Sequence, residues 1–194
     1  MIMMLVRPTT ARLSQVLPRC RRNFITLPDL SAFAPGSSEP QRYKERKVLP
    51  YTQKQLYDVV SDVASYPKFV PFCSGSRILT HPPKQTSDGK QVVEAELTVG
   101  FLTFKESYVS TVKCIPNSSV EAVASSSTPL FKTLSTIWRF EPSRAATPNS
   151  TLVTLDLEYA FANPLHASVS SAFFGQVSKA MVQAFEERCR RVYG

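Results

Sequence analysis

Few residues in this sequence have the types and spacing that catalysis or metal binding requires. The 194 residues include only two histidines, His81 and His166, and four cysteines, without a CxxC or HExxH pattern, so we expect no metal site. Lys105 and Glu106 are candidates for acid–base chemistry, and only one of two adjacent strand residues can face a cavity. An inward Glu106 would need a partner or a proton, whereas a surface pair bonded to a neighbouring strand is the simpler interpretation. We therefore expect no catalytic residues.

A long helix over residues 163–193 is predicted to carry one side of any binding site. Asn163 suits an N-cap, Pro164 suits the first turn, and arginines gather at the end where the helix dipole favours cations. Its apolar residues recur at spacings of three and four and form one stripe: Val169, Phe173, Val177, Ala180, Met181, Ala184 and Phe185. Such a stripe is typical of core packing, but Met181 and the pair Phe173 and Phe174 also suit a deformable cavity wall.

Residues 76–162 predict the other side of the site as antiparallel strands separated by turn-forming clusters. Apolar and polar residues alternate there, so each strand has one inward face. The inward residues are Val93, Ala95, Leu97, Val99 and Phe101; Leu134, Thr136, Trp138 and Phe140; and Val153, Leu155, Leu157, Tyr159 and Phe161. Asp156 and Glu158 share the opposite, wet face, which argues against a catalytic carboxylate pair.

The N-terminal half of the domain begins with a strand over residues 43–49. Thr52 and Gln55 predict a capping box, and a helix follows that we expect to end at Tyr66-Pro67. The order is then strand, one or two helices, about six antiparallel strands and a long helix. It predicts an α+β helix-grip fold, a curved antiparallel β-sheet wrapped around a long C-terminal α-helix. Because the sheet need not close fully on the helix, we expect a pocket for an apolar ligand.

The predicted pocket lining comes from these inward faces and from a short apolar segment over residues 68–72. Two interpretations of this segment stay open: it caps one end of the core, or it forms a lid or docking edge at a membrane surface. The expected ligand-binding residues are Phe69, Val70, Phe72, Leu97, Val99, Phe101, Trp138, Phe161, Phe174, Val177 and Met181.

Charge is distributed unevenly along the chain. Five arginines precede the first carboxylate, Asp29, and without them the net charge of +8 falls to +3, which weakens the case for a nucleic-acid-binding domain. Arginine, serine and leucine without acidic residues predict a mitochondrial transit peptide over residues 1–24, cut after Phe24. Residues 25–42 are rich in proline and serine and resemble a linker. The folded domain is expected over residues 43–194.

Three segments resemble the mitochondrial coenzyme Q-binding START-domain proteins, within the polyketide cyclase and START-like superfamily. They are LYDVVSDVASYPKFVPFC (56–73), LTVGFLTFKESYVSTV (97–112) and the C-terminal stretch that begins LDLEYAFANPLHASVSSAFF (155–194). The stretch WRFEP (138–142) adds to the match, which covers nearly all of the expected domain. The resemblance implies a START-like helix-grip fold with a hydrophobic cavity.

The resemblance also implies coenzyme Q or a related lipid as a bound ligand, not as a catalytic cofactor. It implies a non-enzymatic carrier or chaperone that supports respiration and ubiquinone biosynthesis. We expect a peripheral protein on the matrix side of the mitochondrial inner membrane, with the membrane surface and quinone-biosynthesis or respiratory proteins as partners and no nucleic acid. Two alternatives stay open: a ribosome- or RNA-associated START-like module, for which Lys44, Arg46 and Lys47 are the nearest basic stripe, and a cyclase-like enzyme that uses Glu106.

Overall fold

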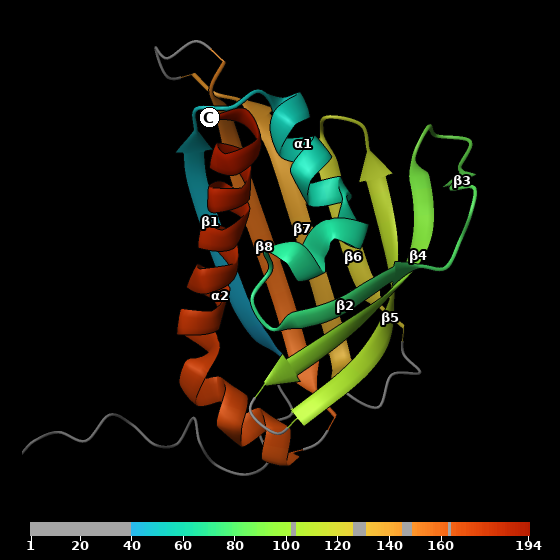
Figure 1. Cartoon of the computed structure of the whole chain (residues 1–194), viewed down its shortest axis with the longest axis vertical. Coiled ribbons are helices and arrows are strands. Elements are labelled where there is room, and N and C mark those ends of the chain that lie inside the picture. Colours follow the sequence, from blue (N-terminus) through green and yellow to red (C-terminus); the bar gives the residue numbers. More distant parts are fainter. Residues whose placement is uncertain (1–39, 102–103, 126–130, 145–148, 163) are drawn as a thin grey trace, which may run out of the picture. The chain divides into compact units, whose positions relative to one another are not determined.

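The structure is a computed structural model that describes residues 40–101, 104–125, 131–144, 149–162 and 164–194, with side chains for all of these except 101, 104 and 164–174. The expected α+β fold is confirmed: one large antiparallel sheet is combined with a long C-terminal helix (Figure 1). The elements are β1 (Gln41–Leu49), α1 (Gln53–Ser61), the 3-10 helix η2 (Val63–Lys68), β2 (Cys73–Ile78), β3 (Lys84–Gln85), β4 (Gln91–Phe101), β5 (Phe104–Ile115), β6 (Ser119–Ala124), β7 (Phe131–Pro142), β8 (Thr151–Phe161) and α2 (Pro164–Tyr193). The predicted transit peptide and Asn163 lie outside the described residues.

All strand pairs of the eight-stranded sheet are antiparallel, in the order β1-β8-β7-β6-β5-β4-β2, and β3 pairs with β4. The sheet is strongly twisted, so β2 and β4 run obliquely to β7 and β8 (Figure 1). The three helices α1, η2 and α2 lie on the same face of this sheet (Figure 1). The first strand begins two residues before the expected boundary, because Gln41 and Arg42 continue the pairing with β8.

The alternation of apolar and polar residues decides which face of the sheet is covered by the helices. Ala95, Trp138 and Leu155 are buried on the covered face, as expected from the sequence. The opposite face carries ion pairs between neighbouring strands: Arg42 with Glu158 at 3.3 Å, Lys44 with Asp156 at 3.3 Å, and Arg139 with the same Asp156. Asp156 and Glu158 therefore pair with cations on the outer face, in agreement with the predicted wet face.

The capping box predicted at the start of α1 is confirmed. The Thr52 side chain accepts a hydrogen bond from the backbone N–H of Gln55, and the Gln55 side chain accepts one from the backbone N–H of Thr52 at 2.9 Å. The predicted helix end at Tyr66-Pro67 is wrong, since α1 ends at Ser61 and Pro67 lies inside η2. Asp62 leaves the helical conformation with a φ of −78° and a ψ of 63°, and the chain then continues as a 3-10 helix that contains Pro67.

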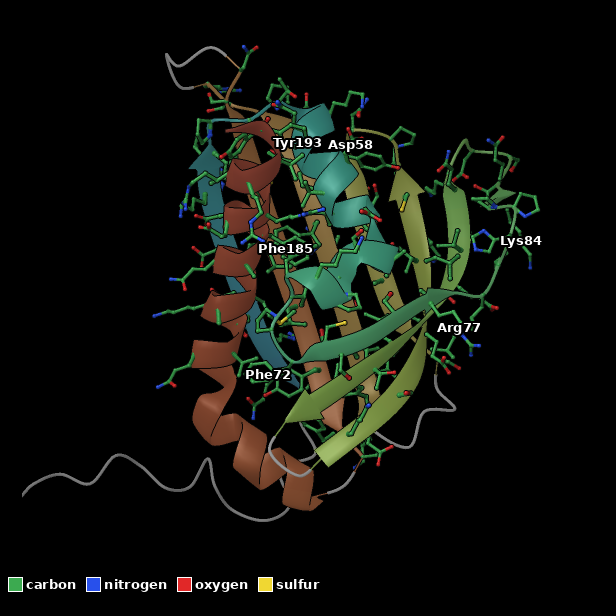
Figure 2. All side chains as sticks on the ribbon, viewed as in Figure 1. Asp58, Phe72, Arg77, Lys84, Phe185 and Tyr193 are labelled. Atoms are coloured by element: carbon green, nitrogen blue, oxygen red, sulfur yellow. The ribbon has the colours of Figure 1, made fainter. Side chains whose placement is uncertain are left out.

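An aromatic cluster joins α2 to the rest of the core. Phe185 of α2 is buried, and its ring centroid lies 5.0 Å from that of Trp138, 5.4 Å from that of Tyr66 and 5.2 Å from that of Phe69. Figure 2 shows Phe185 on the side of α2 that faces η2. One residue of α2 thus contacts the sheet and two aromatic residues of the segment between α1 and β2.

Replacing Phe185 with alanine removes this contact. We expect Phe185→Ala to lower the free energy of unfolding by about 3–5 kcal/mol, the usual range for a buried phenylalanine, measured by urea denaturation. Val192→Ala on the same helix is the control, because Val192 is exposed and its removal should change stability by less than about 0.5 kcal/mol. Equal effects of the two substitutions would contradict the role given to the aromatic cluster.

Candidate ligand-binding site

A cavity of about 280 Å³ lies between α2 and the helix-bearing face of the sheet. Its wall is formed by α2, η2, the turn before β2 and strands β4 to β8. Two hydrophobic clusters border the cavity. Trp138 and Phe185 belong to one cluster, Phe131 and Tyr159 belong to the other, and all four side chains line the cavity. The cavity is therefore the unfilled space between two packed aromatic clusters.

The sheet side of the cavity is a set of inward residues brought into register by strand pairing. Val112 of β5 lies opposite Ala122 of β6, Ala122 opposite Thr136 of β7, and Thr136 opposite Leu157 of β8. All four residues line the cavity. Three of the four residues, Val112, Ala122 and Thr136, have small or medium-sized side chains. The space in front of this row is therefore open, whereas the larger aromatic side chains on either side fill theirs.

The helix side of the cavity is narrow. Val177, Ser178, Met181 and Phe185 line it, and their spacing puts them on one side of α2. Ser178 is 1% exposed and Phe185 is 5% exposed, so the centre of the buried stripe passes through a serine. The more N-terminal stripe residues Val169 and Phe173 lie outside the described side chains.

The turn between η2 and β2 lies where the cavity meets the surface. Phe72 both lines the cavity and remains 41% exposed, and Figure 2 shows it at this turn. Its φ angle is 65°, a left-handed conformation that a bulky residue rarely adopts. The backbone N–H of Gly100 donates a hydrogen bond of 2.8 Å to the carbonyl oxygen of Phe72 and ties the turn to β4. Strain of this kind is often found at ligand-binding turns.

The structure brings most of the predicted ligand-binding residues together around one cavity. Two predicted residues, Phe101 and Phe174, have side chains outside the described part of the chain. The predicted residues that line the cavity are Val70, Phe72, Leu97, Val99, Trp138, Phe161, Val177 and Met181.

Phe69 belongs to the core cluster instead of the cavity wall. Its ring centroid lies 5.8 Å from that of Tyr66 and 5.2 Å from that of Phe185, and the guanidinium carbon of Arg188 lies 5.5 Å from it. Phe69 thus caps the core, as one of the two interpretations of segment 68–72 expected. Phe72, three residues later, lines the cavity and is partly exposed.

Sequence patterns did not single out several residues of the wall. Tyr108 and Ser110 of β5 face the cavity, but the alternation there mixes hydroxyl and apolar residues and gives no clear inward face. Tyr66 also lines the cavity, but next to Pro67 the sequence indicates only a helix end there. Ser178 lines it as well, but as a polar residue it interrupts the apolar stripe. The register with Leu97, which lies opposite Tyr108, would have identified the β5 residues.

The polar groups of the described wall are mostly hydroxyls, and those of the tyrosines stay neutral. The Tyr66 hydroxyl donates to the carbonyl oxygen of Val60 at 2.6 Å, and the Tyr159 hydroxyl donates to Oε1 of Gln41 at 2.8 Å. Burial raises the pKa of both Tyr66 and Tyr108 above the usual tyrosine value. These groups can form hydrogen bonds with a ligand but do not exchange protons near neutral pH.

The register also assigns a face to each residue of the Lys105–Glu106 pair. Glu106 lies opposite Val99, which lines the cavity, so Glu106 is on the helix-bearing side of the sheet and Lys105 is on the outer side. Both residues are exposed, and Glu106 is not among the described residues that line the cavity. Glu106 is therefore placed beyond the cavity at the start of β5.

Metal centres and membrane-spanning helices have recognisable signatures in a structure. Within the described residues, no group of three or more His, Cys, Asp or Glu side chains is arranged to hold a metal ion. In the same part of the chain, no helix combines the length and the apolar composition needed to cross a bilayer.

The relatives of this chain include coenzyme Q-binding proteins and a ribosome association toxin. Coenzyme Q-binding protein COQ10 homolog B, mitochondrial, of Xenopus laevis is 40% identical over 152 residues, which make up 78% of this chain and 59% of that protein. The chain thus spans less than two thirds of the Xenopus protein. Coenzyme Q-binding protein COQ10, mitochondrial, of Dictyostelium discoideum is 40% identical over 76% of this chain and 68% of that protein. Ribosome association toxin RatA of Pseudomonas aeruginosa is 31% identical over 76% of this chain and 94% of that protein.

Solved structures with the same architecture include enzymes and proteins without a named activity. An 18 kDa protein from Caulobacter crescentus is 31% identical with a TM-score of 0.62, over 79% of this chain and 99% of that chain. The Zhui aromatase/cyclase from Streptomyces has a TM-score of 0.61 at 17% identity, over 78% of this chain and 94% of that chain, and shares the fold.

A protein-family model also matches this chain. The model described as polyketide cyclase/dehydrase and lipid transport matches residues 49–186, from the end of β1 to the Phe185 region of α2. This range contains every described residue that lines the cavity. The chain belongs to the polyketide cyclase/dehydrase and lipid transport family.

Proposed function

We propose that this protein is a non-enzymatic carrier or chaperone of coenzyme Q. The observation that carries the proposal is the apolar cavity between α2 and the sheet, whose wall contains neutral hydroxyls. The names of the 40% identical Xenopus and Dictyostelium relatives as coenzyme Q-binding proteins support the same ligand. The range matched by the family model, residues 49–186, contains the described cavity residues.

The physical need for such a carrier follows from the ligand. A polyprenyl quinone is almost insoluble in water, and covering its apolar surface recovers about 25 cal/mol per Å². The cavity volume of about 280 Å³ is just below the ~300–1,000 Å³ usual for small-molecule sites. The quinone ring and the start of the tail therefore fit the cavity, while the rest of the tail extends through the mouth beside Phe72.

The proposed contacts are the predicted residues that line the cavity. Leu97 and Val99 of β4, Trp138 of β7 and Phe161 of β8 form the sheet side, and Val177 and Met181 form the helix side. Val70 adds a buried contact from the segment after η2, and Phe72 lies at the mouth. Phe101 and Phe174 complete the proposed set from the sequence pattern.

The ribosome-associated alternative rests on the bacterial relative named ribosome association toxin. Binding to RNA requires basic side chains that are available to phosphates. On β1, however, Lys44 pairs with Asp156 at 3.3 Å and Lys47 pairs with Glu186 at 2.7 Å. Two of the three basic residues of this stripe are thus paired with carboxylates, which favours the lipid carrier.

The enzymatic alternative rests on the fold shared with aromatase/cyclases. Acid–base catalysis requires a titratable group within hydrogen-bond reach of the substrate. Glu106 is exposed and lies outside the described wall, and burial raises the pKa of Tyr66 and of Tyr108, which line the cavity. The arrangement favours binding over turnover.

The proposed place of action is the matrix side of the mitochondrial inner membrane, with the protein bound peripherally. The support is the acid-free, arginine-containing N-terminal segment together with the mitochondrial names of the relatives. Its partners would be the membrane that holds the quinone and the respiratory or quinone-biosynthesis proteins that use it. Phe72 at the cavity mouth and the exposed Lys68 nearby in the chain are the groups proposed to meet the lipid surface.

The first test is extraction of lipid from the protein purified from a cell that makes coenzyme Q. We expect mass spectrometry to find coenzyme Q with the wild type and with Gln176→Glu, because Gln176 is exposed. Val177→Glu should lose it, because the carboxylate would enter an apolar wall. Co-purified RNA with no quinone would favour the ribosome-associated alternative, and equal quinone in both variants would contradict the proposed binding site.

The second test concerns the mouth. Phe72→Asn removes the aromatic side chain with a residue that tolerates a φ of 65°. We expect binding to cardiolipin-containing vesicles to weaken about fivefold, equivalent to ~1 kcal/mol of lost apolar burial, with no loss of thermal stability. Val123→Ser, at an exposed residue of β6, should leave vesicle binding unchanged. Unaltered vesicle binding by Phe72→Asn would move the membrane contact elsewhere.

A further inference from the structure

Ser178 is a polar residue in the wall of a mostly apolar cavity, and the binding of apolar surface alone does not require its hydroxyl. It is 1% exposed, and it lies on α2 among Met181, Val182 and Phe185, where an apolar residue would be expected. Within the described part of the chain, its Oγ is the one buried side-chain oxygen or nitrogen atom that lacks a hydrogen-bond partner. Alanine would fit the same position, favour the helix and avoid the cost of an unpartnered buried hydroxyl.

The surroundings exclude the usual structural roles of a buried serine. A serine in a helix often donates to the carbonyl four residues earlier, but Ser178 makes no such bond in the structure. Two other hydroxyls of the described wall do have partners: that of Tyr66 donates to the carbonyl oxygen of Val60, and that of Tyr159 donates to Oε1 of Gln41. Ser178 lines the cavity, so the partner it lacks within the protein can be supplied from the cavity.

We propose that the Ser178 hydroxyl donates a hydrogen bond to an acceptor oxygen on the ring of the bound lipid. The inference rests on the proposed function and adds what the site recognises besides apolar surface. A quinone carbonyl or a ring methoxy oxygen is the matching chemistry, because each accepts a hydrogen bond and carries no charge. The ring then lies against α2 near Val177 and Met181, and hydrocarbon tails without such an oxygen lack this contact.

The test compares Ser178→Ala with the wild type by isothermal titration calorimetry of two probes. Decylubiquinone carries ring oxygens, and decylbenzene has a ring and the same tail without them. We expect Ser178→Ala to bind decylubiquinone about three- to tenfold more weakly, as for loss of one hydrogen bond, and to bind decylbenzene as the wild type does. The thermal midpoint of the ligand-free protein should stay equal or rise, because an unpartnered buried hydroxyl is removed.

Ser76→Ala is the matched control, since the Ser76 hydroxyl already donates to the carbonyl oxygen of Val63 at 2.8 Å. This substitution should lower the thermal midpoint and leave both affinities unchanged. Equal decylubiquinone affinity in Ser178→Ala and wild type would overturn the inference alone, as would a lowered thermal midpoint of ligand-free Ser178→Ala, which would assign the hydroxyl a structural role. Failure of the wild type to bind decylubiquinone would overturn the proposed function itself.

Discussion

Phe185 fixes how closely α2 can approach the sheet, and the cavity depends on that separation. Its ring packs between Trp138 of β7 and the pair Tyr66 and Phe69, with centroids 5.0–5.4 Å apart, so this end of the helix is held by filled volume. At the other end, Phe131 packs against Phe161 with centroids 4.8 Å apart. The Phe185 ring acts as a spacer between α2 and the sheet, and the smaller side chains that line the cavity do not fill the space beside it.

The unfilled volume has an energetic consequence. Protein interiors are normally close-packed, so an apolar space of about 280 Å³ leaves its wall with fewer packing contacts than a core residue usually has. A lipid that fills this space should stabilise the fold. Binding and folding are coupled through the same residues, because Trp138 and Phe185 belong both to the core cluster and to the cavity wall.

The same fold serves catalysis in an aromatase/cyclase and lipid transport elsewhere in the family, so the wall decides the function. Here the described wall offers hydroxyls held neutral by burial, with Glu106 outside it. The strained Phe72 turn lies at the surface end of this wall. Those features suit the proposed binding of an uncharged lipid.

Sequence patterns predicted the fold where one physical signal dominated. Alternation placed Leu97, Trp138 and Leu155 on the inward face, and the Thr52 capping box located the start of α1. The end of α1 was misplaced because proline is compatible with a 3-10 helix as well as with a helix end.

The cavity wall was harder to predict than the strands. Phe69 and Phe72 are equally apolar in the sequence, and only the backbone turn between them sends one ring to the core and the other to the cavity mouth. Ser178 is not among the predicted ligand-binding residues, because a polar residue at the centre of an apolar stripe does not add to the hydrophobic pattern. Tertiary packing, which a periodic pattern does not contain, decides all three positions.

The central claim is that an uncharged quinone enters the space between α2 and the sheet. Trp138 is the only tryptophan of the chain and lines that space, so its fluorescence reports directly on occupancy. Titration with decylubiquinone should quench this fluorescence with saturation at one equivalent, because a bound quinone ring contacts the indole. Quenching that rises linearly with concentration and never saturates, as in random collision, would contradict the account.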